Sequence, residues 1–229
     1  MLTGDRHIRA AFDQELHRVE DDVLRMGSLV GELLHRAVEA LKNQDSGAAA
    51  AVTEADAQVD QMHVEIEQRI ITLMATQQPM AGDLRALTAA LAIAIDLERM
   101  ADHADGIART ARRLRDSTLL RPMVDIPYMA HVVRGMLHDV LEAFARRDPV
   151  LAEAVAAKDE TVDALHHQVF RVLLTYMAES PRRLSEALDL IMVAMRLERA
   201  ADHVTNIAER VVFMATGRMK VLNGEGVHG

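Results

Sequence analysis

Hydrophobic residues recur every three or four positions along most of the chain. Over residues 12–41 they fall at alternating spacings of four and three. The segments 93–114 and 193–214 repeat this spacing position for position, and a third stripe covers 52–66 and continues less regularly. Such a stripe is typical of an amphipathic helix with one buried face. Because no segment shows the alternation of a strand, the pattern predicts an all-α chain of bundled helices.

Polar, glycine and proline residues interrupt this pattern and place the ends of the helices. Short breaks occur around Asp45 and Pro79, and the longest one, 116–127, carries two prolines. Asp148-Pro149 and Ser180-Pro181 each predict a side-chain cap followed by proline at the first helical position. The breaks therefore predict six long antiparallel helices, over roughly 5–43, 46–77, 81–116, 126–147, 149–179 and 182–216.

The chain also contains an internal repeat. Residues 97–109 read LERMADHADGIAR and residues 197–210 read LERAADHVTNIAER, an offset of 100. The segments EADAQVDQMH (54–63) and AKDETVDALH (157–166) match at an offset of 103. A repeat of this length indicates two copies of one supersecondary unit. We therefore predict two tandem, pseudo-symmetric three-helix bundles followed by a flexible tail, with bounds 1–117, 118–217 and 218–229.

Composition narrows the class of protein. Half of the 229 residues are hydrophobic but only 3% are aromatic, so the core must consist of aliphatic side chains, Met and Ala. The net charge of −9 argues against a duplex nucleic-acid partner. The absence of Cys excludes disulfides and thiolate metal sites. The N-terminus has no apolar signal core, and the longest nearly apolar run, 86–95, is too short to span a bilayer. We expect a cytoplasmic protein that meets membranes only through partners.

Acidic residues recur in pairs four positions apart, which places both carboxylates of a pair on one helix face. Four such pairs occupy corresponding places in the two copies: Asp56 and Asp60, Glu98 and Asp102, Asp159 and Asp163, and Glu198 and Asp202. With Leu97 and Met100 in the buried seam, Glu98 and Asp102 point away from it. We therefore expect these pairs at the surface or in a groove between neighbouring helices. Asp105 extends this face in the first copy, and Asn206 and Glu209 lie near its continuation in the second.

Like charges at this spacing repel each other by about 0.2–0.5 kcal/mol per pair. If antiparallel neighbours bring two pairs together, four carboxylates need a cation or a proton. Oxygen ligands without sulfur favour Fe(III), Mn, Mg or Ca over structural zinc. The eight acids are therefore candidate metal ligands. The alternative is a solvated acidic surface, with Arg99 and Arg199 partly neutralising their neighbours.

The histidines near these pairs are weaker candidates. His63 and His166 follow an acid by three residues, a spacing that permits joint ligation, whereas His103 and His203 follow directly and point about 100° away. We expect surface or capping roles for all four. The sequence has no glycine-rich phosphate loop and no nucleophile or metalloprotease signature, so no catalytic residue is predicted.

The chain resembles the PhoU family, regulatory accessory proteins of bacterial phosphate-specific ABC transport. The segments that carry the resemblance span about residues 8–217, and their order and double occurrence make it specific. They are Phe12 with Met26-Gly27, QQPMAGDLR at 77–85, DLERMADHADGIAR at 96–109, KDETVD at 158–163 and LERAADHVTNIAERVVFMATG at 197–217.

The resemblance implies two pseudo-symmetric three-helix bundles side by side, with metal clusters, of iron in some members, on the bundle surface. The matching positions are Asp56, Asp60, Glu98, Asp102, Asp159, Asp163, Glu198 and Asp202. It also implies an adaptor rather than an enzyme, often a homodimer. Such an adaptor couples the transporter's ATPase subunit to a sensor histidine kinase and acts as a negative regulator of the phosphate-starvation response.

The two copies differ where the motif ends. The second copy reads NIAE at 206–209, whereas the first reads GIAR at 106–109. We therefore expect the two sites to differ in occupancy. Two other readings stay open: a carboxylate-bridged metalloenzyme, which would use inward-facing Glu-x-x-His motifs, and a helical adaptor without metal. The sequence also leaves open which metal is bound and whether the regulated transporter carries phosphate.

Overall fold

The protein is an all-α bundle, as the sequence predicts. The structure, a computed structural model, describes residues 2–115 and 125–222, with side chains from residue 10 onward. Within these ranges it has no strand. Its elements are α1 (Leu2–Asn43), α2 (Ser46–Gln77), α3 (Ala81–Arg113), α4 (Asp125–Arg146), α5 (Pro149–Ala156), α6 (Asp159–Glu179), the 3₁₀ turn η1 (Pro181–Arg183) and α7 (Leu184–Thr216). Most of the predicted linker, including Pro122, and the end of the predicted tail lie outside the described residues.

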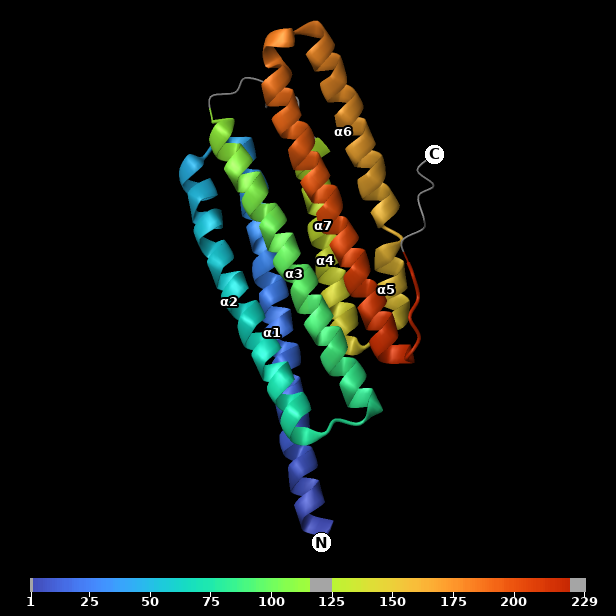
Figure 1. The fold of residues 1–229 in the computed structure, drawn as a ribbon. Helices are drawn as coiled ribbons and strands as arrows, with labels where there is room; N and C mark the ends of the chain where they lie inside the picture. The colour runs from blue at the N-terminus through green and yellow to red at the C-terminus, as the bar shows by residue number, and fades with distance from the viewer. Residues whose placement is uncertain (1, 116–124, 223–229) are drawn as a thin grey trace.

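The helices form two three-helix bundles that pack side by side (Figure 1). The first bundle is α1–α3, and the second is α4–α7, in which α5 and α6 together take the place of one helix. Helices α3 and α7 run antiparallel at the centre, α1 and α4 lie behind them, and α2 and α6 occupy the outer edges. Each repeated acidic segment therefore belongs to an outer helix, α2 or α6, or to the central helix beside it, α3 or α7.

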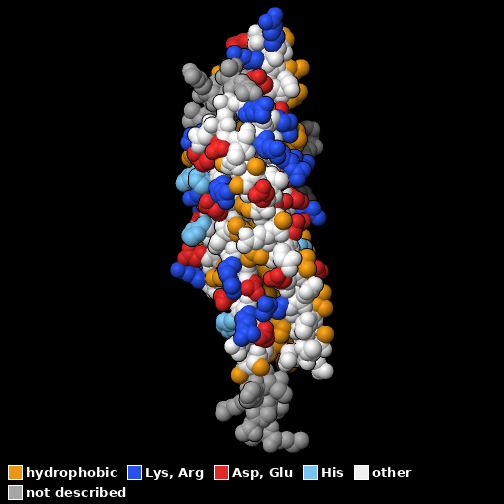
Figure 2. Space-filling model, turned by 90° about the vertical axis from the view of Figure 1, so that its left-hand side faces the viewer, with side chains coloured by type: hydrophobic (Ala, Val, Ile, Leu, Met, Phe, Trp, Pro, Cys, Tyr) orange, Lys and Arg blue, Asp and Glu red, His pale blue; other side chains and the backbone are white. Residues whose placement is uncertain are grey.

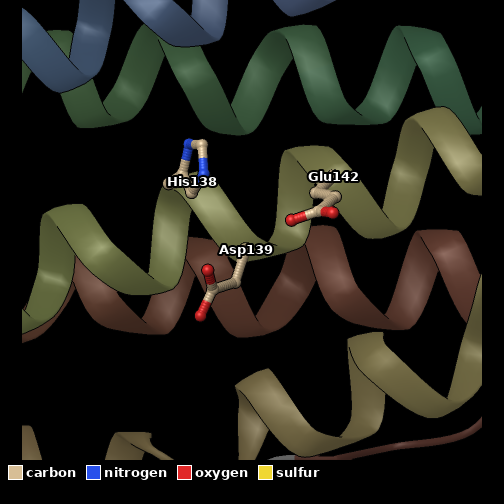
Figure 3. Close-up of side chains that lie close together, drawn as sticks. All are labelled: His138, Asp139 and Glu142. Carbon is tan, nitrogen blue, oxygen red and sulfur yellow. The ribbon is translucent and has the colours of Figure 1, made fainter.

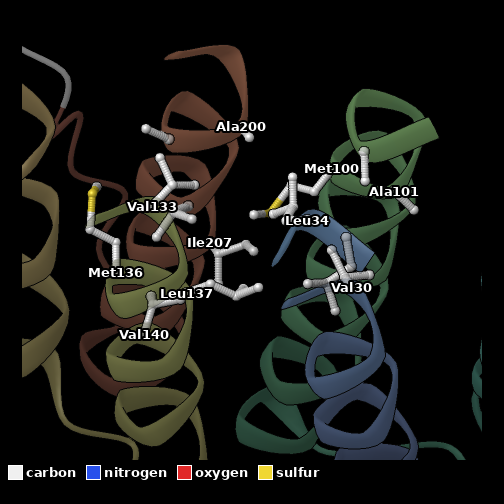
Figure 4. Packing of buried hydrophobic residues seen from close by; sticks show 14 of the residues in the cluster. Val30, Leu34, Met100, Ala101, Val133, Met136, Leu137, Val140, Ala200 and Ile207 are labelled. Carbon is white, nitrogen blue, oxygen red and sulfur yellow. The ribbon is translucent and has the colours of Figure 1, made fainter. Parts of the chain in front are cut away.

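A single hydrophobic core runs through both bundles. Leu97 and Met100, which the sequence places in the seam of α3, are fully buried, and so is Leu197 of α7. Figure 4 shows Leu34 of α1 and Met100 of α3 facing Ile207 of α7 and Leu137 of α4 across the contact between the bundles. Burial of these aliphatic side chains is the main force that holds the two copies together.

The ends of the helices follow the local signals in most places. Asp45 and Asp148 each accept hydrogen bonds from two backbone N–H groups of the first turn that follows, so the predicted cap at Asp148 is confirmed. Gly217 ends α7 with a φ of 73°, a left-handed conformation that suits glycine. The predicted cap at Ser180 is wrong. Its side chain makes no capping bond, and Pro181 begins a 3₁₀ turn, so α7 starts only at Leu184.

The predicted single helix over 149–179 is also wrong, because the chain breaks at Ala157-Lys158 between α5 and α6. The N–H of Lys158 donates to the carbonyl of Val155, and the N–H of Thr161 donates to that of Lys158. These bonds span three residues instead of four, which tightens the turn. The Lys158 ammonium pairs with Asp139 of α4 at 2.6 Å. The break places Asp159 at the first position of α6.

The residues that follow α7 run back along the second bundle. Lys220 pairs with Glu153 of α5 at 2.8 Å, and the N–H of Leu222 donates to Glu209 of α7 at 2.8 Å. The bounds at 117 and 217 that we predict for the two copies and the tail stay predictions. In the described ranges, none of the helices combines the length and the apolar character needed to cross a bilayer.

Candidate metal centre

The first acidic site comprises Asp56 and Asp60 of α2 and Glu98 and Asp102 of α3. The two helices are neighbours, so their acidic faces meet. Asp56 is half-buried, and burial together with the charges of Asp105, Asp60 and Asp102 raises its pKa from 3.8 to about 6. Acids of both helices therefore repel the charged form of Asp56, and the nearby Arg109 offsets this repulsion only in part.

Asp105 joins this first site from one turn further along α3. It is buried, and its Oδ2 atom pairs with Arg109 at 2.7 Å. Its other oxygen, Oδ1, is buried without a hydrogen-bond partner. On the outer side of α3, Arg99 contacts Glu98 at 3.4 Å and Asp102 at 3.5 Å. The first site thus has two arginines beside it and one carboxylate oxygen with no partner.

The second acidic site comprises Asp159 and Asp163 of α6 and Glu198 and Asp202 of α7. Burial and the charges of the other three acids raise the pKa of Asp159 from 3.8 to about 7. Burial followed by neighbouring acids also raises the pKa values of Glu198 and Asp202. The Oδ1 atom of Asp159 is buried without a hydrogen-bond partner. All four predicted acids of the second copy therefore act on one another.

The chemistry of both sites suits a hard cation. Each offers only carboxylate oxygens, and each includes a buried oxygen that lacks a donor. A cation or a proton would remove the repulsion that raises these pKa values. None of the eight acids belongs to a described group of three whose ligand atoms all lie within 4.8 Å of one another. The carboxylates are thus close enough to repel but are not gathered around one point.

Among the described side chains, the one group of three that meets this distance is His138, Asp139 and Glu142 of α4. Sequence reasoning missed it, although its members are spaced so as to lie near one another on a helix. Figure 3 shows that all three side chains come from one helix, α4. Asp139 pairs with Lys158 at 2.6 Å, and Glu142 pairs with Arg146 at 2.7 Å. A cation here would have to displace two ion pairs, so the group is a weaker candidate.

The histidines beside the acids behave in two ways. His63 and His166 lie partly buried on the outer helices. The surface or capping roles expected for His103 and His203 are wrong, because their rings meet between α3 and α7 with centroids 5.6 Å apart. Nδ1 of His203 lies 2.9 Å from Oδ1 of Asp96. The turn of about 100° from each acid to the next residue directs these rings toward the other bundle.

Comparison with known proteins identifies the fold and its repeat. The family model described as PhoU domain matches residues 23–111 and again 126–211. The chain belongs to the PhoU family. It is 39% identical over 212 residues to a protein of Zymomonas mobilis named phosphate-specific transport system accessory protein PhoU homolog, a match that covers 93% of this chain and 90% of the relative.

Solved PhoU structures share the fold. The crystal structure of PhoU from Pseudomonas aeruginosa matches with a TM-score of 0.86 and 39% identity, covering 90% of this chain and all of the other. The structure of the phosphate transport system regulatory protein PhoU from Streptococcus pneumoniae matches with a TM-score of 0.85 and 31% identity, covering 91% and 99% of the two chains. These likenesses confirm the resemblance seen in the sequence.

In this member of the PhoU family, the residues that differ between the copies pack the two bundles against each other. Asn206 donates to Asp96 at 3.3 Å across the contact between α3 and α7. The corresponding positions, Gly106 and Arg196, also meet, and a Cβ at residue 106 would lie 2.2 Å from the Arg196 guanidinium. Glu209, which we placed near the acidic face, instead accepts from the tail. The GIAR and NIAE endings therefore serve packing as well as charge.

Proposed function

We propose that this protein is a regulatory accessory protein of a phosphate transport system. The names of relatives in several bacteria, which match over more than nine-tenths of this chain, support the proposal. In our proposal the protein is cytoplasmic, is not an enzyme and acts as a negative regulator of the phosphate-starvation response. It couples a phosphate ABC transporter ATPase subunit to a sensor histidine kinase, most simply as a homodimer. The family resemblance supports these finer points.

The proposal that the protein binds metal rests on the two acidic sites, in which carboxylates repel one another. Each has a half-buried aspartate with a raised pKa, about 6 for Asp56 and about 7 for Asp159, and each has a buried carboxylate oxygen without a donor. Asp56, Asp60, Glu98 and Asp102 would hold a cation in the first bundle. Asp159, Asp163, Glu198 and Asp202 would do so in the second. Iron, manganese and magnesium ions are the candidates.

A bound cation supplies positive charge that relieves the repulsion between these carboxylates. The protein's own part is to fix the acids on two rigid helices of each bundle, α2 and α3 or α6 and α7. Ordering these acids would tie the outer helix to the central one. It would also leave a charged surface of defined shape for a partner protein to contact.

Two alternatives remain, and the placement of the acids bears on both. A carboxylate-bridged metalloenzyme places its acids inside the bundle, whereas the eight acids here are all partly or fully exposed, which favours an adaptor. A metal-free adaptor would use the same surface as a plain acidic patch. The buried Oδ1 atoms of Asp105 and Asp159, which have no hydrogen-bond partner, support metal over this last reading.

A genetic test addresses the regulatory role. Deleting the gene should derepress phosphate-starvation genes in phosphate-rich medium, and the wild-type gene should restore repression. An Asp102→Ala/Asp202→Ala variant should fail to restore it, because both acidic sites lose a ligand. The control is Asp21→Ala/Glu179→Ala, which removes two exposed acids away from the sites and should restore repression. Unchanged expression in the deletion strain would contradict the regulatory proposal.

A further inference from the structure

The C-terminal end of α3 carries a dense group of cations in an otherwise acidic protein. Four of the seven residues from Arg109 to Arg115 are arginine, while the whole chain has a net charge of −9. These four, Arg109, Arg112, Arg113 and Arg115, line a cleft of about 380 Å³ together with Ser46 and Ala50 of α2. Lys and Arg side chains gather in the upper part of the face shown in Figure 2, where α2 begins and α3 ends.

The ion pairs of the cleft leave it with an uncompensated cation. Arg109 pairs with Asp105 at 2.7 Å, and Arg113 pairs with Asp189 of α7 at 2.6 Å. Arg112 makes no hydrogen bond or ion pair within the described part of the chain. Like charges held this close repel one another. An anion in the cleft would offset that repulsion.

The fold does not require these cations. The same positions in the second copy are Glu209, Val212, Phe213 and Ala215. The second bundle therefore closes the corresponding helix end without a single arginine at these places. Arg113 has a structural role through its pair with Asp189, but the exposed Arg112 contributes only charge to the cleft.

The start of α2 forms the opposite wall of the cleft. The Asp45 side chain already accepts from the N–H groups of Gly47 and Ala48, so the free donors of this helix end are largely used. The Asp45 carboxylate also weakens the local positive potential. Affinity for an anion must therefore come from the arginines, with the Ser46 hydroxyl as an added donor.

We propose that this cleft binds a small oxyanion of the phosphate class. A guanidinium presents a planar fork of donors that matches two oxygens of a phosphate group. Four guanidinium groups line this open cleft, two of them paired with Asp105 and Asp189, and its volume is large enough for inorganic phosphate or a small phosphorylated molecule. This site is confined to the first bundle, needs no metal and is separate from the eight acids. Arg109 connects the two regions, because its guanidinium also pairs with Asp105.

Isothermal titration calorimetry with inorganic phosphate, at constant ionic strength, tests the proposal. The wild-type protein should show saturable binding. The Arg112→Gln/Arg115→Gln variant should bind about tenfold more weakly or worse, because it loses charge-assisted hydrogen bonds. The matched control, Arg171→Gln/Arg182→Gln, removes two exposed arginines elsewhere and should bind as the wild type does. Thermal melting checks that each variant is folded.

Three results would overturn the proposal. The first is no saturable binding of phosphate to the wild type. The second is equal binding by the wild type and the Arg112→Gln/Arg115→Gln variant. The third is a protein that does not bind free phosphate but sediments with phosphatidylglycerol vesicles and not with phosphatidylcholine vesicles. That outcome would assign the arginines to a membrane surface. None of these measurements depends on the regulatory role, so the cleft can fail while the proposed function stands.

Discussion

Replacing Asp159 by Asn should stabilise the metal-free protein at neutral and alkaline pH. The second acidic site raises the pKa of Asp159 from 3.8 to about 7, because burial and three neighbouring acids disfavour its charged form. Between about pH 4 and pH 7 the folded state therefore holds a proton that the unfolded state has released. Stability falls as the pH rises from about 4 to about 7 and then levels off. The Asp159→Asn variant has no carboxyl at this position, so its stability should not fall in this way.

The size of the effect follows from the shift in the pKa. A change from 3.8 to about 7 corresponds to roughly 4 kcal/mol at full strength. The side chain is only half-buried, so we halve this for solvent screening and expect a gain of about 2 kcal/mol. In a chain of this size that gain raises the melting temperature by about 4–8 °C. The gain should be small near pH 4, where the wild-type carboxyl is protonated in the folded state and about half protonated in the unfolded state.

The assay is thermal and urea unfolding of wild type and Asp159→Asn in EDTA across this pH range. Glu160→Gln is the matched control, because Glu160 is the exposed neighbour of Asp159 and its replacement removes the same charge. It should change stability little at any pH. A variant no more stable than the wild type at about pH 8, or equally stabilised at pH 4 and 8, would refute the electrostatic reasoning. With Mn²⁺ added, the order should reverse, because only the wild type keeps all four ligands.

Three further glycine substitutions test the packing of the helices. Gly27→Ala should destabilise the protein by about 1–3 kcal/mol in urea unfolding, because the new Cβ would lie 2.5 Å from the buried Leu141 side chain. At Gly135, on the facing helix, a new Cβ would meet no atom within 4 Å, so Gly135→Ala should stabilise the protein by about 0.5–1 kcal/mol. Equal effects would show that α1 and α4 are not in close contact. Gly106→Ala should destabilise the wild-type protein by displacing the Arg196 guanidinium, but it should be neutral or stabilising in an Arg196→Ala background. If the effects of the two substitutions on stability simply add, the contact between residues 106 and 196 is contradicted.

Much of the fold could be read from the hydrophobic pattern. The seam through Leu97 and Met100 is buried as the spacing predicts, and the eight acids lie partly or fully exposed on the predicted helices. Periodicity is informative here because each helix buries a stripe against its own bundle, although α3 and α7 also bury a second face against each other. The internal repeat then predicts that the second half of the chain has the same architecture as the first.

The break at Ala157-Lys158 could not be predicted in the same way. The surrounding residues include no glycine or proline and favour a helix, and the corresponding stretch of α2 is continuous. The break depends on bonds that span three residues and on the pairing of Lys158 with Asp139 of α4. These contacts accompany the break, and local propensity gives no sign of them.

The pairing between bundles was also out of reach of the sequence. Asp96 corresponds to Arg196 in the repeat, and Gly106 corresponds to Asn206, so each pair looks like an unrelated difference between copies. The antiparallel contact of α3 with α7 brings Asp96 to Asn206 and Arg196 to Gly106. Each difference between the copies is explained only by the residue that it meets across the contact of α3 with α7. The position of His103 against His203 has the same origin.

We propose that both acidic sites hold metal, and elemental analysis of the purified protein tests this proposal. Wild type should contain iron, manganese or magnesium. The Asp102→Ala and Asp202→Ala single variants should each lose metal from one bundle, and the double variant should lose it from both. The melting curves should show that every variant is folded. Equal metal content in the wild type and the double variant, or near-zero content in both, would contradict the claim.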